Sequence, residues 1–286
     1  MRGIIRRIAA IALAAAAMAL SACAQLNQLS GAGVERVQST ELRAALEPGF
    51  RLHLPPGDGP FPIVVAIHGC GGPHRNIDDY VARANRNGVA LMEVDSFGPR
   101  GITYNYAIAN ICRARELWGR ERAGDVLAAL DYLREQSDID GSRMMLLGWS
   151  HGSWTVMDLF SMDLVDERPT NLIDTPREGV EGVRAALLFY PICNRLASLS
   201  DDDGWDQKIR THFILVKNDV FKEENCIRII EEDLQPAGVE ATYNLVEGVT
   251  HAFDEVQFPE SRFRYDEDAA QAALDFFENF ISETLL

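Results

Sequence analysis

A serine in a glycine-rich turn carries the clearest chemical signal in the sequence. Ser150 stands at the centre of Gly148-Trp149-Ser150-His151-Gly152, which has the pattern G-x-S-x-G. The apolar run 144–147 before the turn predicts a buried strand, and the apolar spacing over 154–160 after it favours a helix. In such a strand-turn-helix element the serine is strained and exposed above the sheet, where it can act as a nucleophile. The same pattern is compatible with a glycine-rich turn whose serine only caps the helix.

A nucleophilic serine requires a base, and the base requires an acid that orients it. Three histidines follow Ser150 in the chain. His212 opens a predicted strand, at the opposite end from the serine, and His151 begins the helix and points away. His251 lies in the loop 247–253, directly after a predicted strand and in a loop short enough to hold it over Ser150. We therefore predict His251 as the base.

Two carboxylates are candidates for the acid. Asp219 follows the apolar run 213–216 at the end of a predicted strand, and it completes the chain order Ser, Asp, His that accompanies this kind of turn. Asp254 is the alternative, three residues after His251, and it would compete only if that segment turned back on itself. The sequence favours Asp219.

Strands and helices must alternate to position these residues. Apolar runs predict strands at 61–68, 89–94, 144–147, 183–189, 213–216 and 243–246, and helical spacing predicts helices at 73–86, 120–135, 154–160, 223–234 and 268–281. Buried strands with interleaved helices predict a doubly wound, mostly parallel α/β fold of three layers, with ligands at the carboxyl ends of the strands. No change in composition divides residues 47–286, so we predict one domain there.

Composition and charge exclude several classes of function. The 286 residues are 47% hydrophobic, enough for a full core, and 43 acidic against 27 basic residues give a net charge of −16. Such a chain would repel a phosphate backbone, so we expect no nucleic-acid partner. The sequence has no H-E-x-x-H motif, and the acidic run 201–203 is more typical of a solvated turn than of a calcium site. We predict no metal.

The first 23 residues have the features of a bacterial export signal. Three arginines precede the apolar stretch 8–20, which is too short to span a bilayer comfortably. Leu20-Ser21-Ala22-Cys23 resembles the lipobox of bacterial lipoproteins, which predicts lipidation of Cys23 and, with Ala24 after it, attachment to the outer membrane facing the periplasm. Ordinary cleavage at Ala22-Cys23-Ala24 is the alternative and would give a soluble periplasmic protein. Residues 24–46 are then a tether and N-terminal segment.

From about Phe61 to Phe253 the chain resembles the dienelactone hydrolase family of α/β-hydrolases. The likeness rests on His68-Gly69-Cys70-Gly71-Gly72, Asp95-Ser96-Phe97-Gly98-Pro99-Arg100-Gly101, the serine turn, Tyr190-Pro191, Asn218-Asp219 and His251-Ala252-Phe253. The resemblance implies an α/β-hydrolase fold and a Ser or Cys nucleophile with Asp and His. It also implies action on esters or lactones without a cofactor. The founding enzymes of the family use Cys where this chain has Ser150.

The glycine-rich turn 68–72 looks like the oxyanion-hole loop of α/β-hydrolases. Its glycines let backbone N–H groups face a cavity without side chains in the way. The amide of Cys70 or Gly71 would bind the oxyanion together with the amide of His151, the residue after the nucleophile. A tight strand-to-helix turn accounts equally well for the glycines alone.

Candidates for the substrate pocket are less specific. Arg100 and Trp149 are proposed to bind substrate, and Tyr104, Tyr106 and Trp118 to shape the pocket. Arg100 could capture a carboxylate, and it could equally pair with one of the many acids. Aromatic residues at these positions are at least as typical of a core.

Four cysteines remain after the export signal, and an even count in an exported protein favours disulfides. In the strand order usual for the resembled fold, the strands that precede Cys70 and Cys112 are neighbours, and so are those that precede Cys193 and Cys226. The nucleophile strand lies between the two sets. The fold therefore implies the pairs Cys70–Cys112 and Cys193–Cys226.

Together these features predict a serine hydrolase that cleaves a small-molecule carboxylic ester or lactone through an acyl-enzyme. A peptidase or acyltransferase could use the same triad. A non-catalytic envelope protein could keep the fold and use the pocket only for binding.

Overall fold

One seven-stranded sheet forms the centre of the protein. The structure is a computed structural model that describes residues 33–193, 205–256 and 262–286. The strands are β1 (Phe50–His53), β2 (Phe61–Ile67), β3 (Ala90–Val94), β4 (Ile139–Trp149), β5 (Val183–Phe189), β6 (Arg210–Val216) and β7 (Ala241–Val246). They are ordered β1-β3-β2-β4-β5-β6-β7. Only β1 runs antiparallel to its neighbour, so the sheet is mostly parallel, as predicted.

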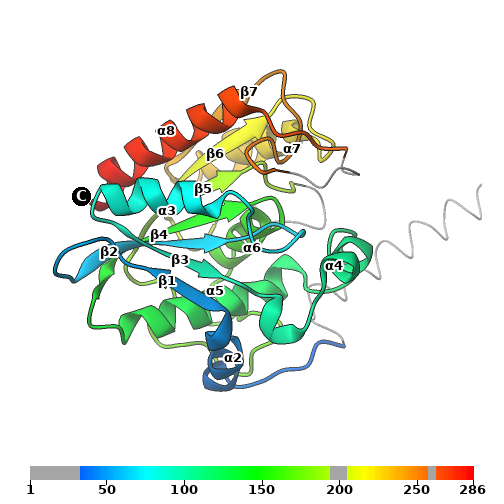
Figure 1. Cartoon of the computed structure of the whole chain (residues 1–286). Helices are drawn as coiled ribbons and strands as arrows, with labels where there is room; N and C mark the ends of the chain where they lie inside the picture. The colour runs from blue at the N-terminus through cyan, green and yellow to red at the C-terminus, as the bar shows by residue number, and fades with distance from the viewer. Residues whose placement is uncertain (1–32, 194–204, 257–261) are drawn as a thin grey trace, which may run out of the picture.

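Helices cover both faces of the sheet, as Figure 1 shows. The helices are α2 (Ser39–Leu46), α3 (Ile77–Arg86), α4 (Tyr104–Asn110), α5 (Gly119–Arg134), α6 (His151–Phe160), α7 (Glu223–Arg228) and α8 (Glu267–Leu285). Helices α3 and α8 pack on one face, and α2, α5, α6 and α7 pack on the other. None of the helices in the described part of the chain is long and apolar enough to span a membrane.

The strand sequences explain the three layers. Along β2, Ile63, Val65 and Ile67 belong to the core cluster on the α5 face, whereas Val64 and Ala66 belong to the cluster on the α3 face. Successive side chains of a strand point to opposite faces, so a continuous apolar run is buried on both sides only between two helical layers. The predicted three-layer α/β fold is confirmed.

The start of α3 and the end of α7 differ from the predicted helix boundaries. Helix α3 begins at Ile77 rather than at residue 73, because buried His74 accepts a hydrogen bond from the Asn76 amide in the preceding turn, 3.2 Å. The helix predicted over 223–234 is α-helical to Arg228 and continues as the π-helical segment η3 (Ile229–Leu234).

Helices α2 and α4 and strand β1 were not predicted. Leu42 and Leu46 of α2 are buried in the same cluster as α5, and Arg43 pairs with Asp131, 2.9 Å. The sequence analysis started the folded domain at Glu47. Because α2 packs on the core, the folded domain includes residues before Glu47. The export segment and the acidic run 201–203 lie outside the described residues.

Both implied disulfides are present. Cys70–Cys112 and Cys193–Cys226 each have Cα atoms 5.1 Å apart. The pairing follows from the sheet, in which β4 separates the neighbours β2 and β3 from the neighbours β5 and β6. The first bridge joins the glycine-rich turn after β2 to the segment after α4.

Candidate active site

Ser150 occupies a strained turn between β4 and α6. Its backbone has φ 51° and ψ −109°, a left-handed region that side chains disfavour. The two glycines of the motif are required by close packing. A Cβ at Gly148 would lie 2.8 Å from the amide nitrogen of Ser153, and a Cβ at Gly152 would overlap the carbonyl oxygen of Ile67. The strand-to-helix turn therefore requires glycine at both flanking positions of the G-x-S-x-G motif, and the serine between them is strained, as predicted.

His251 lies between Ser150 and Asp219. Its Nε2 is 2.8 Å from the Ser150 Oγ, and its Nδ1 is 2.8 Å from the Asp219 Oδ2. An ionised carboxylate only accepts hydrogen bonds, so Nδ1 carries the proton, and Nε2 is left to accept the Ser150 hydroxyl proton. The structure therefore brings together the three residues predicted from sequence order.

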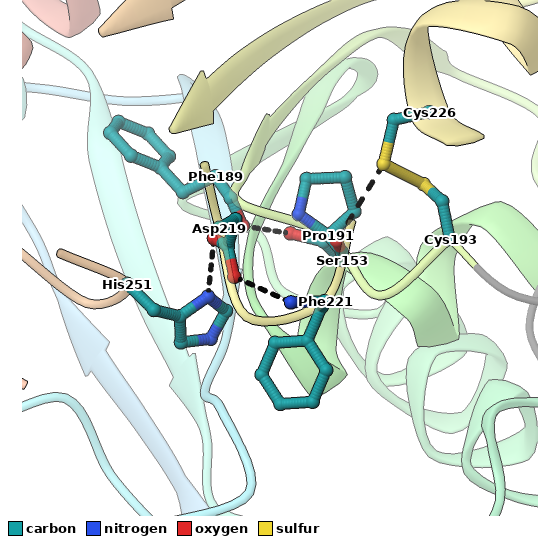
Figure 2. Close-up of a disulfide and its surroundings, with 8 residues drawn as sticks. All are labelled: Ser153, Phe189, Pro191, Cys193, Asp219, Phe221, Cys226 and His251. Carbon is teal, nitrogen blue, oxygen red and sulfur yellow. Dashed lines mark hydrogen bonds and ion pairs between the residues drawn. A yellow bond between two sulfur atoms is a disulfide. The ribbon is translucent and has the colours of Figure 1, made fainter. Parts of the chain in front are cut away.

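The loop after β6 fixes the Asp219 carboxylate. Its Oδ1 accepts the amide of Phe221 at 2.9 Å, which leaves Oδ2 directed at His251 (Figure 2). Glu223 at the start of α7 accepts the amides of Asn218 and Asp219, at 2.7 and 3.0 Å. Hydrogen bonds before and after Asp219 therefore hold the turn, and the Asp219 carboxylate keeps one orientation.

Aromatic rings enclose the imidazole. The ring centroid of His251 lies 4.7 Å from Tyr190, 4.8 Å from Phe221 and 5.1 Å from Phe263. His251 itself is only 4% exposed. These rings limit rotation of the imidazole and exclude water from one side of its hydrogen bonds.

The glycine-rich turn after β2 borders the serine. A Cβ at Gly69 would lie 3.6 Å from the Ser150 Cβ, and the Gly72 amide closes the turn on the Gly69 carbonyl at 3.3 Å. Cys70 and Gly71 lie within this turn. His151 is the first residue of α6, so its amide has no acceptor inside the helix. The predicted oxyanion residues are all in the segments that adjoin Ser150.

The side chain of Asp254 is bound by residues other than His251. Its Oδ1 accepts the hydroxyl of Tyr190 at 2.6 Å, and its Oδ2 accepts Tyr80 at 2.5 Å and the Trp149 indole at 3.0 Å. His74 Nε2 approaches Oδ2 at 3.5 Å. We call these five residues the Asp254 network. The carboxylate bound to His251 is Asp219, and Asp254 is committed to the network.

Burial shapes the titration of the Asp254 network. It opposes ionisation of Asp254, but the approach of His74 and the hydrogen bonds from Tyr190 and Tyr80 outweigh it, so the pKa of Asp254 lies below its ordinary value. Burial and the Asp254 carboxylate raise the pKa of Tyr80 and of Tyr190 well above the usual range. Both hydroxyls therefore remain donors at neutral pH.

The two proposed substrate-binding side chains are placed differently from that prediction. Trp149 is 2% exposed, packs against His74 with ring centroids 4.4 Å apart, and belongs to the core. Arg100 forms a two-pronged ion pair with buried Asp125, at 2.7 and 2.8 Å. A carboxylate that is 1% exposed needs such a partner, so the alternative reading of Arg100 as an ion-pair residue fits the structure.

The other pocket candidates are more exposed. Tyr104 and Tyr106 stand exposed on α4, and a Cβ at Gly71 would lie 3.9 Å from the Tyr104 ring. Trp118 is half-buried and packs, as Phe221 does, against the buried cluster of Trp154 and Ile192. Within residues 33–193, 205–256 and 262–286, no group of His, Cys, Asp or Glu side chains is arranged to hold a metal ion.

Comparison with known proteins extends these observations. Residues 80–163, from α3 to just past α6, match the model of the prolyl oligopeptidase family. A dienelactone hydrolase-like promiscuous phosphotriesterase from metagenomic libraries is 17% identical over 83% of this chain and 92% of its own, with a TM-score of 0.61.

Two further solved structures are similar. A putative dienelactone hydrolase from Klebsiella pneumoniae is 13% identical over 79% of this chain and 88% of its own, with a TM-score of 0.59. The apo form of Thermogutta terrifontis esterase 2 is 17% identical over 82% and 88%, with a TM-score of 0.57. At these identities the likeness is one of architecture, and with the sheet order it establishes that the chain has the α/β-hydrolase fold.

Proposed function

We propose that the protein is a serine hydrolase that cleaves carboxylic esters or lactones through an acyl-enzyme. The observation that carries the proposal is the unbroken hydrogen-bonded line from Asp219 through His251 to Ser150, with the serine on a strained turn. A line of this geometry converts a weakly acidic hydroxyl into a nucleophile, because the base stands within hydrogen-bond reach of its proton.

In the first half-reaction, His251 Nε2 takes the hydroxyl proton as the Ser150 Oγ bonds to the carbonyl carbon. The carbonyl oxygen becomes an oxyanion that the amides of the glycine-rich turn and of His151 bind, each such donor being worth about 3 kcal/mol. Asp219 stabilises the imidazolium. Collapse of the intermediate breaks the bond to the alcohol oxygen, which leaves with the proton from His251.

In the second half-reaction, water replaces the alcohol. His251 takes one proton from the water as its oxygen bonds to the acyl carbon, and a second tetrahedral oxyanion forms at the same amides. Its collapse breaks the bond to the Ser150 Oγ, which regains the proton from His251. The carboxylic acid is released, and the triad returns to its starting state.

The test is turnover of p-nitrophenyl esters of graded acyl length by the protein and two serine variants. Ser150→Ala should abolish turnover with the fold intact. Ser161→Ala is the matched control, because Ser161 caps the C-terminus of the same helix and its hydroxyl donates to the Asp158 carbonyl. Ester turnover that survives in Ser150→Ala would contradict the proposal.

A serine peptidase is the second candidate, favoured by the match of residues 80–163 to the prolyl oligopeptidase family. That match includes the serine turn, which both classes would share. The solved esterase and dienelactone hydrolase-like structures are similar over about four-fifths of the chain, and this wider likeness supports the ester first. Peptide p-nitroanilides assayed beside the esters separate the two, because anilide turnover exceeding ester turnover would favour the peptidase.

The proposal extends to where the enzyme works. The features of residues 1–23 support export, lipidation of Cys23 and attachment to the outer membrane on its periplasmic side. A lipid anchor would hold the hydrolase at the membrane surface while its small-molecule ester substrate reaches it from the periplasm.

A further inference from the structure

A buried arginine lies behind the two backbone segments that border Ser150. Arg122, in the first turn of α5, has no exposed surface. Its Nη1 donates to the His68 carbonyl at 2.7 Å, its Nε donates to the Ser96 hydroxyl at 2.9 Å, and His151 Nδ1 lies 3.2 Å from Nη1. His68 opens the glycine-rich turn, and His151 follows the nucleophile. One guanidinium thus contacts both sources of the proposed oxyanion amides.

The charge of Arg122 has unusual surroundings. No carboxylate forms an ion pair with it in the described part of the chain, and Nη2 has no hydrogen-bond acceptor there. Burial lowers the pKa of Arg122 to about 10, so the guanidinium is still charged at neutral pH. The carboxylates of Asp125 and Asp95 favour the charged guanidinium without an ion pair to it, and Asp125 is bound by Arg100. A buried cation without a directly paired anion is normally costly, and the fold keeps one here.

The neighbouring histidines are neutral. Burial and the Arg122 charge hold the pKa of His68 and of His151 well below the usual range. His68 accepts the Ser96 amide at Nε2, 3.2 Å, and donates from Nδ1 to the Gly69 carbonyl, 2.7 Å. Each ring therefore has a fixed tautomer, and among Arg122, His68 and His151 only Arg122 carries a charge at neutral pH.

We propose that Arg122 is a positioning residue for the oxyanion site. It clamps the turn after β2 to the N-terminus of α6, and it holds a positive charge behind the amides that bind the oxyanion. This inference rests on the proposed serine hydrolase function. Negative charge develops on the substrate only in the tetrahedral state, so a fixed cation in a low-dielectric interior favours that state over the neutral ester.

The experiment compares a neutral ligand with an anionic one. Ester KM reports the neutral ground state, and kcat reports the tetrahedral oxyanion. Phenylboronic acid gives a second measure of the anion. The Ser150 oxygen bonds to boron while its proton passes to His251, so boron becomes a tetrahedral anion and no bond to boron is broken.

Arg122→Gln keeps a polar side chain but removes the charge. We expect kcat for p-nitrophenyl acetate to fall by about tenfold or more, somewhat below the loss for deleting a direct oxyanion donor. The Ki of phenylboronic acid should rise by a similar factor, and KM should stay within about twofold, since the ester is neutral. Arg122→Lys should lie between this variant and the wild type, because an ammonium keeps the charge but cannot reproduce the planar fork.

Arg134→Gln is the matched control. Arg134 ends the same helix, is partly buried, and donates to the carbonyls of Gly179 and Glu181 at 3.0 and 2.7 Å, near the start of β5 and away from Ser150. Its loss should lower the melting temperature and leave kcat, KM and Ki within about twofold of the wild type, because the lost contacts are structural alone.

The possible outcomes distinguish failure of the Arg122 proposal from failure of the proposed serine hydrolase function. A folded Arg122→Gln protein with wild-type kcat and Ki would overturn it, as would equal losses in Arg134→Gln. Should Arg122→Gln fail to fold, Arg122→Lys decides: wild-type kcat and Ki in that variant overturn the inference, and a joint loss with KM unchanged supports it. A wild-type protein that neither hydrolyses esters nor binds the boronate refutes the proposed function itself.

Discussion

Asp219 and Asp254 are the same chemical group in two opposite settings. Asp219 is held by loop amides and contacts one titratable ring, His251. Asp254 accepts three hydrogen bonds from the permanent donors Tyr80, Tyr190 and Trp149. Their side chains are 5% and 1% exposed, so burial alone does not distinguish them. What distinguishes them is the second contact of the neighbouring histidine. His251 also reaches the Ser150 hydroxyl, whereas His74, which approaches Asp254, accepts the Asn76 amide.

The comparison also shows that sequence distance is a poor guide to partnership. Asp254 is three residues from His251, yet its side chain joins the α3 helix and the end of β4 instead. Asp219 is 32 residues away and meets the imidazole, because the parallel neighbours β6 and β7 end at the same edge of the sheet. The sheet, rather than the local chain, brings the acid to the base.

The sharpest way to break the comparison is Asp219→Asn. We expect kcat to fall by about 10⁴-fold, the size known for triads in which the amide imposes the wrong imidazole tautomer. The free energy of unfolding should change little, since the amides around residue 219 still find an oxygen. Steady-state kinetics with urea unfolding would check both. Activity losses equal to those of Asp254→Asn would reverse the choice of acid.

Asp254→Asn should show the opposite pattern. The amide carries no charge, so hydrogen bonds from buried Tyr80 and Tyr190 weaken, and bonds to charged groups contribute about 1.5–3 kcal/mol each. We expect a clear loss of unfolding free energy, measured in urea, with a much smaller loss of kcat than in Asp219→Asn. Unchanged stability would show that the network does not hold the fold.

The pH dependence of stability sharpens the same contrast. The folded pKa of Asp254 lies below its ordinary value, so its contribution is fully present above the unfolded pKa of about 3.9 and is lost as pH falls through the folded pKa. His74, whose pKa is raised by Asp254, is already charged in the wild type at these low pH values. As pH falls from about 4 to about 2, the wild type should therefore lose more unfolding free energy than Asp254→Asn. Parallel losses in the two proteins would refute the assignment.

Mild reduction of the disulfides should affect the surroundings of Asp219 before it affects the Asp254 network. Both disulfides lie among the loops near Asp219 and the glycine-rich turn, and Figure 2 shows Cys193–Cys226 beside the Asp219 loop. The Asp254 network lies on the face of the sheet that α3 and α8 cover. We expect dithiothreitol to lower ester turnover before tryptophan fluorescence reports loss of the packing around Trp149. Simultaneous loss of both signals would contradict this order.

Removing the proposed anchor should affect neither setting. Cys23→Ser should move the protein from the membrane to the periplasmic fraction with kcat unchanged, because lipid chains would be its stable attachment. Fractionation with immunoblotting checks the location. Mass spectrometry that finds a native N-terminus at Gln25 would refute lipidation.

The features that follow from residue patterns were predicted from the sequence. The apolar runs predicted six strands, the glycines around Ser150 predicted the strained turn, and the chain order predicted Asp219 and His251. Helices α2 and α4 and the four-residue strand β1 were not predicted, because they are short. Helix α2 and strand β1 gain their stability from packing against α5 and β3.

The buried polar groups could not be predicted for a different reason. Arg and Asp are residue types that usually lie on the surface, and a single sequence does not reveal that Arg122 and Asp254 are buried. Trp149 was misplaced for the same reason, since an indole beside a nucleophile suits a pocket as well as a core. Only the folded arrangement shows which polar groups face inward.

The most direct test of the triad is the site of covalent labelling by a fluorophosphonate. Only a serine activated by its base displaces fluoride from phosphorus at low reagent concentration. Intact mass and peptide mapping should find one adduct, on Ser150, absent from Ser150→Ala and strongly slowed in Asp219→Asn. An unlabelled wild-type protein, or an adduct on another residue, would contradict the account.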